Sequence, residues 1–156
     1  MKLEYEKILV AETMKEDAIG QWLKPAKTEL AIVPVNVPVF KITLNVVYGS
    51  FEEFKRFMLT KFEQKITHAK ANAYAMSFEH NGTTWNFINI TSCEWTAQDY
   101  GTIAHELHHA THFSLENMGV TYGTAGEEVY AYMQGHLMEL VIRAFAMLRK
   151  KRKKKR

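Results

Sequence analysis

Apolar and polar residues alternate along the segment from residue 40 to residue 48. The apolar positions are Phe40, Ile42, Leu44, Val46 and Tyr48, and the polar residues Lys41, Thr43 and Asn45 lie between them. Because successive side chains of a strand point to opposite faces, this pattern predicts a strand that is buried on one face. Pro34 and Pro38 precede it, and we expect them to keep that preceding segment out of the centre of a sheet.

A helical pattern begins after Gly49. Ser50 and Glu53 have the Ser-x-x-Glu spacing of a capping box, which marks the start of a helix. The side chains that follow at helical intervals are Phe54, Phe57, Met58, Lys61 and Phe62. We therefore expect a helix over residues 51–66, with its aromatic stripe packed in the core.

The next pattern is that of a β-hairpin. Apolar side chains alternate at Tyr74, Met76 and Phe78, and Asn81-Gly82 is a favoured dipeptide for a tight two-residue turn. Thr83–Ile90 then reads as the partner strand.

Two helices are expected in the remainder of the chain. Thr96 and Asp99 repeat the capping pattern before a helix over residues 97–117. A glycine-containing loop separates it from a last helix over residues 126–149. The elements together predict an α+β fold, in which a small antiparallel or mixed sheet of three to five strands packs on helices.

Composition and charge add a boundary to this picture. The chain has 156 residues, 47% of them hydrophobic, which suits one globular domain. Residues 149–156 carry eight positive charges, and removing these from the net charge of +3 leaves −5 for residues 1–148. We expect a single domain over 1–148 and a disordered basic tail over 149–156, which could contact nucleic acid without sequence specificity.

The sequence also limits location and covalent chemistry. No apolar run approaches the roughly 18 residues that a membrane-spanning helix needs, so we expect no membrane contact. The apolar stretch at residues 8–11 is shorter than the core of a signal peptide, which predicts a cytoplasmic protein. Cys93 is the single cysteine, so an intramolecular disulfide and a cysteine-rich zinc site are excluded; we expect it to be buried near a strand end.

The residues with the clearest chemical meaning are His105-Glu106-Leu107-His108-His109, a His-Glu-x-x-His motif inside the predicted helix. Residues i and i+4 lie one turn apart on one helix face, so the imidazoles of His105 and His109 can reach one metal ion. Glu106 can then hold a metal-bound water and take its proton. Ile103, Leu107 and Ala110 form the opposite face, which we expect to pack on the core.

A catalytic zinc usually has a third protein ligand. The candidates are His112, Glu127 and Glu128. Three ligands on one straight helix cannot readily surround one ion, which disfavours His112. On a helical wheel Glu127 falls on the apolar, inward face and Glu128 on the polar face, so helical phase alone favours Glu127.

The stretch HELHHATHF, followed by GEEVYAYMQGHL, resembles the gluzincin branch of the zincin metallopeptidases, and in particular small zincin-like proteins encoded by bacteriophages. The resemblance covers about residues 97–140. It implies a minimal zincin-like fold, Zn²⁺ as cofactor, His105 and His109 as metal ligands and Glu106 as general base. The Glu-x-x-Ala-Tyr pattern aligns at Glu128, so the resemblance favours Glu128 over Glu127 as the third ligand.

The resemblance also implies how substrate and transition state are bound. Zincins bind an extended peptide by strand addition at a sheet edge, and Thr83–Ile90 is our candidate for the strand near the cleft. We expect no separate C-terminal domain that would stabilise the oxyanion. Tyr132 and His136 are the candidate substitutes.

The expected function is therefore that of a zinc-dependent metallopeptidase, which hydrolyses peptide bonds in a protein or peptide substrate. One alternative is a metal-binding zincin-fold protein with a structural role, for example in a virion. Another is a nucleic-acid-associated protein that acts through residues 149–156. Glu106 favours the peptidase, because a purely structural site has no need of a base there. A phage-encoded protein would reside in the host cytoplasm or the virion.

Overall fold

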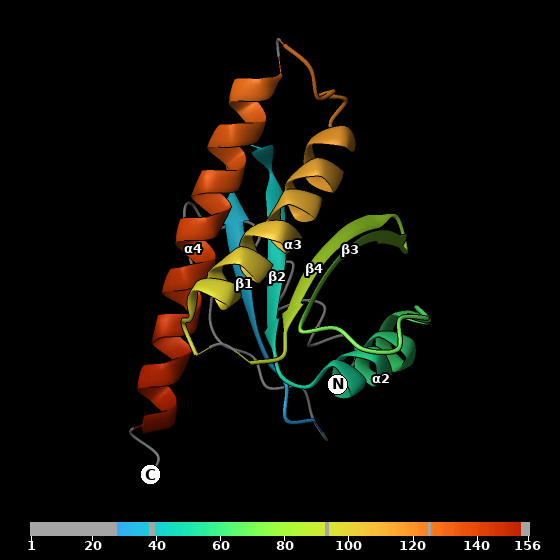
Figure 1. Ribbon diagram of the computed structural model, residues 1–156. Coiled ribbons are helices and arrows are strands. Elements are labelled where there is room, and N and C mark those ends of the chain that lie inside the picture. The colour runs from blue at the N-terminus through green and yellow to red at the C-terminus, as the bar shows by residue number, and fades with distance from the viewer. Residues whose placement is uncertain (1–27, 38–39, 93, 125, 154–156) are drawn as a thin grey trace.

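The computed structural model describes residues 28–37, 40–92, 94–124 and 126–153, and Cys93 lies outside them. These residues form an α+β fold, as predicted, with a mixed four-stranded sheet (Figure 1). The elements in chain order are β1 (Ala31–Val37), β2 (Ile42–Tyr48), α2 (Phe51–Phe62), β3 (Ala73–His80), β4 (Thr83–Ile90), α3 (Ala97–Glu116) and α4 (Glu127–Lys153).

The strand order in the sheet is β1-β2-β4-β3. β1 pairs antiparallel with β2, β2 pairs parallel with β4, and β4 pairs antiparallel with β3. Pro34 therefore lies in an edge strand, as expected. The expectation that Thr83–Ile90 offers a free edge for strand addition is wrong, because β4 lies inside the sheet and β3 forms the other edge.

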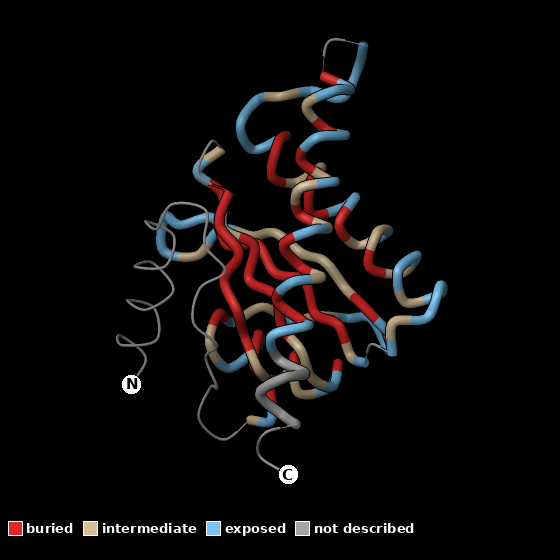
Figure 2. Tube along the Cα trace, turned by 90° about the vertical axis from the view of Figure 1, so that its left-hand side faces the viewer, coloured by how far each residue is buried: buried red, intermediate tan, exposed pale blue. Residues whose placement is uncertain are grey.

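Helices cover both faces of the sheet (Figure 1). α3 and α4 pack on one face, in a core cluster that includes Leu44, Val46 and Ile88. α2 packs on the other face, in a cluster that includes Val47 and Phe87. Figure 2 shows buried residues running through the strands between these two layers.

Burial on both faces corrects the expectation of a half-buried strand β2. Asn45 was expected on a polar face, but it is only 2% exposed. Its Nδ2 donates a hydrogen bond to the carbonyl oxygen of Asn86 on β4 at 3.1 Å. β2 is a central strand with a parallel neighbour, and parallel pairs are commonly covered on both sides.

The predicted turn and helix starts are confirmed. The Ser50 side chain accepts the N–H of Glu53, and Thr96 and Asp99 form a complete capping box. Asn81 and Gly82 both have positive φ, at 51° and 73°, as a type I′ turn requires. α2 ends at Phe62 rather than residue 66, because Glu63 takes the left-handed conformation.

The last helix is longer than the sequence predicted. α4 begins at Glu127 and ends at Lys153, so residues 149–153 have helical backbone where we expected a disordered tail. Residues 154–156 lie outside the described part of the chain. None of the helices in the described residues is long and apolar enough to cross a membrane.

Candidate metal centre

The predicted inward face of α3 is confirmed. Ile103, Leu107 and Ala110 are all buried against the sheet side of the helix. Since the helix repeats every 3.6 residues, this places His105 and His109 on the opposite side. The side chain of His105 is accordingly 69% exposed.

The two histidines face each other across one helical turn. Their Nε2 atoms are 3.2 Å apart and their rings meet edge to face, with centroids 4.8 Å apart. Two nitrogens that ligate one tetrahedral zinc at 2.0–2.1 Å are about 3.4 Å apart. The pair therefore fits two ligand positions on one zinc ion. The same separation permits a hydrogen bond when one Nε2 carries a proton.

Glu106 lies between the histidine pair and the sheet. Its side chain is 14% exposed, and its Oε2 accepts the backbone N–H of Ala75 on β3 at 2.8 Å. Its Oε1 lies 3.9 Å from Nε2 of His105. One carboxylate oxygen is thus held by the edge strand, and the other is near the histidine.

On the other flank, α3 meets α4 through Gln134. Its Oε1 lies 3.3 Å from Nδ1 of His108, and its Nε2 donates to the carbonyl oxygen of Ala104 at 3.3 Å. No sequence pattern marks Gln134, because its contacts depend on how the two helices are aligned. These contacts fix the part of α4 that lies beside the motif.

Glu127 and Glu128 begin α4 and are both exposed. Glu128 precedes Gln134 by six residues, which is about 9 Å along a helix axis. Within the described residues, no three His, Cys, Asp or Glu side chains gather so that they could hold a metal ion. The structure thus pairs His105 with His109 and places Glu106 beside His105, and the third ligand remains a prediction.

The remaining candidate residues lie around α4. The Nε2 of His112 is 3.7 Å from Oε2 of Glu116, and its ring lies 6.1 Å from that of Tyr130. Tyr132 is 72% exposed and its ring stacks on that of His136 at 6.3 Å. Tyr132 therefore lies on the solvent side of its helix.

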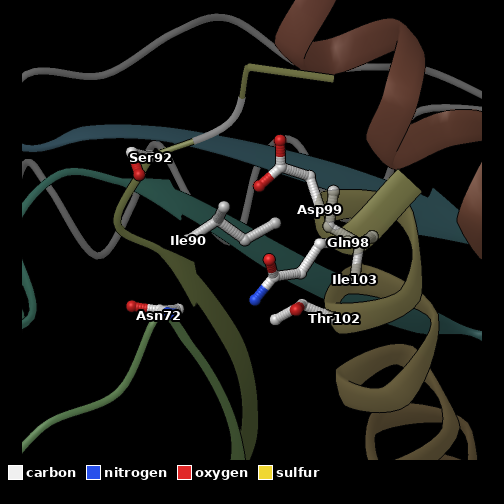
Figure 3. A pocket seen from close by; sticks show the side chains of 7 residues that line it. All are labelled: Asn72, Ile90, Ser92, Gln98, Asp99, Thr102 and Ile103. Carbon is white, nitrogen blue, oxygen red and sulfur yellow. The ribbon is translucent and has the colours of Figure 1, made fainter. Parts of the chain in front are cut away.

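A polar cavity of about 180 Å³ opens at the start of α3, and neither histidine of the pair lines it (Figure 3). Asn72, Ser92, Gln98 and Asp99 are among its lining residues. The Asp99 carboxylate is engaged in the helix cap, where the backbone N–H of Thr96 donates to its Oδ2 at 2.9 Å. This hydrogen bond lowers the pKa of Asp99 below its usual value. The cavity is thus bordered by a carboxylate that serves the helix cap.

Comparison of the chain with models of protein families, with curated proteins and with solved structures gave no match.

Proposed function

We propose that this protein is a zinc-dependent metallopeptidase with its centre on α3. The observation that carries the proposal is the 3.2 Å separation of the His105 and His109 Nε2 atoms, with the Glu106 carboxylate beside them. The resemblance to gluzincins supports the same assignment. Glu128 remains the proposed third ligand, and it would have to approach the pair from the start of α4.

In this proposal His105 and His109 bind the metal ion, and Glu106 transfers the proton. His105 and His109 would hold the ion, which when bound polarises the scissile carbonyl and acidifies water. Glu106 takes a proton from the attacking water as the new carbon–oxygen bond forms. It then gives that proton to the amide nitrogen as the carbon–nitrogen bond breaks, so its carboxylate is regenerated.

A second candidate is a metal-binding protein with a structural role. The hydrogen bond from Ala75 to Glu106 favours it, because this bond joins α3 to the sheet and gives the carboxylate a role without catalysis. A glutamine at position 106 separates the two candidates. It has a similar size and can still accept the Ala75 N–H, but it cannot act as a base.

The test compares hydrolysis of fluorescein-labelled casein by wild type, Glu106→Gln and Glu116→Gln. Glu116 is the matched control, since it is an exposed carboxylate on the same helix. We expect Glu106→Gln to keep its zinc and lose at least about 100-fold in rate, because a general base contributes that much or more. We expect Glu116→Gln to cleave at the wild-type rate. Equal rates in wild type and Glu106→Gln, or no cleavage by wild type, would favour the structural role.

A further inference from the structure

The edge strand β3 contributes a backbone group to the candidate centre. Ala75 pairs with Ile88 of β4, but its N–H donates to Oε2 of Glu106. In an antiparallel pair, alternate residues direct their N–H groups toward the partner and away from it. The Ala75 N–H therefore belongs to the set that points outward from the sheet, and α3 supplies its acceptor.

We infer that the Ala75 N–H is a positioning group for Glu106. A glutamate side chain has several rotatable bonds and would otherwise sample many orientations. The 2.8 Å hydrogen bond holds Oε2 at the strand, while Oε1 lies 3.9 Å from Nε2 of His105. The carboxylate is thereby kept with one oxygen on the strand and the other toward the histidine pair.

The donor to Glu106 is the main-chain N–H of Ala75. The contact therefore depends on where β3 lies and not on the side chain at position 75. Ala75 itself is partly buried and packs against the core beneath α3. The catalytic meaning of this contact rests on the proposed peptidase function. The hydrogen bond and its restraint on Glu106 can be measured without any substrate.

Amide hydrogen exchange of the full-length protein tests the contact directly. We expect the Ala75 amide to be protected in wild type and to exchange at least about tenfold faster in Glu106→Ala. The internal reference is the Met76 amide, whose N–H should point into the β3–β4 ladder and exchange equally in both proteins. A fast Ala75 amide in wild type, or protection that survives in Glu106→Ala while Met76 is unchanged, would overturn the inference.

Proline at position 75 tests the role of the contact in catalysis. Ala75→Pro removes the outward N–H, and an edge strand tolerates proline at such a position because that N–H makes no ladder hydrogen bond. Ser77→Pro is the matched control, because Ser77 is the next outward-directed position, about 6.8 Å further along the strand. Both are assayed with an internally quenched peptide that wild type cleaves.

Loss of an orienting partner typically lowers activity about 10- to 100-fold. We expect Ala75→Pro to lose this much in kcat and to keep its zinc content. Any general effect of proline on β3 should appear equally in Ala75→Pro and Ser77→Pro. Equal kcat values in Ala75→Pro and Ser77→Pro would overturn the positioning role. A wild type that cleaves no peptide contradicts the proposed function instead, and the exchange experiment still decides the contact.

Discussion

Contacts divide the four histidines of α3 into two pairs. His105 and His109 are both exposed, and their Nε2 atoms lie 3.2 Å apart. His108 and His112 turn toward α4, where they meet Gln134 and Tyr130. Both pairs have i,i+4 spacing, but the carboxylate of Glu106 lies beside only the first. The neighbouring carboxylate therefore distinguishes the His105–His109 pair from the His108–His112 pair, although both have the same spacing in the sequence.

The proposed third zinc ligand, Glu128, can be tested by single substitutions. We expect Glu128→Ala to weaken zinc binding at least about tenfold, and Glu127→Ala to weaken it less, because the former removes a ligand and the latter at most its support. Glu139→Ala is the matched control, since Glu139 is exposed on the same helix and pairs with Arg143 at 3.5 Å. The measurement is zinc affinity by competition with a chromophoric chelator.

The reverse ranking would show that helical phase identifies the ligand better than the resemblance does. Affinities equal to that of Glu139→Ala in both variants would remove both glutamates from the centre. The ligand would then have to come from another part of the chain.

At the scale of elements, the caps show why α3 begins where it does. Thr96 accepts the N–H of Asp99, and Asp99 accepts the N–H of Thr96 in return. These short-range patterns are visible in the sequence, and so is the Asn81-Gly82 turn. The ends of α2 and α4 differ from prediction because helix termination depends on weaker preferences and on packing.

The cap gives α3 a dependence on pH. The pKa of Asp99 is lowered in the folded state, first by the backbone hydrogen bond from Thr96, so its ionised form adds stability above the unfolded-state pKa. That contribution is lost as the pH falls through the lowered value. We expect Asp99→Asn to have a lower Tm than wild type at pH 7, and we expect this Tm difference to shrink as the pH falls through the lowered pKa of Asp99.

Thermal unfolding followed by circular dichroism makes this comparison. Glu139→Gln serves as control, because Glu139 pairs only across the surface of α4 with a residue one turn away. A Tm difference between wild type and Asp99→Asn that persists unchanged to pH 2 would contradict the account of the cap.

At the scale of the whole molecule, the sequence predicted the fold class, the hairpin and the inward face of α3. It could not predict that β4 is internal, because either strand of a hairpin can pair with a third strand. It assigned Asn45 to a polar face, since the second covering layer is supplied by α2, whose position is not encoded in the alternation. The contacts of Ala75 with Glu106 and of Gln134 with His108 depend on how β3 and α4 pack against α3, so no sequence motif predicts them.

The basic end of the chain predicts a separate property of the molecule. Residues 149–156 carry eight positive charges, next to a remainder of net charge −5. We expect weak binding to duplex DNA that is independent of sequence and falls by about 0.9 log units per log unit of salt for each phosphate neutralised. Fluorescence anisotropy over a salt series measures it.

Replacing the eight basic residues by glutamine keeps the length of the chain and should abolish this binding without changing zinc content. Binding that persists in the glutamine variant would place the nucleic-acid contact elsewhere. No binding by wild type at low salt would reject nucleic acid as a partner.

Elemental analysis of the purified protein shows whether His105 and His109 together hold a zinc ion. We expect about one zinc per chain in wild type and in His108→Ala, whose histidine lies on the same helix but faces Gln134. We expect about none in the double variant His105→Ala/His109→Ala. Full zinc content in the double variant, or none in wild type produced with zinc supplied, would show that this histidine pair is not a zinc site.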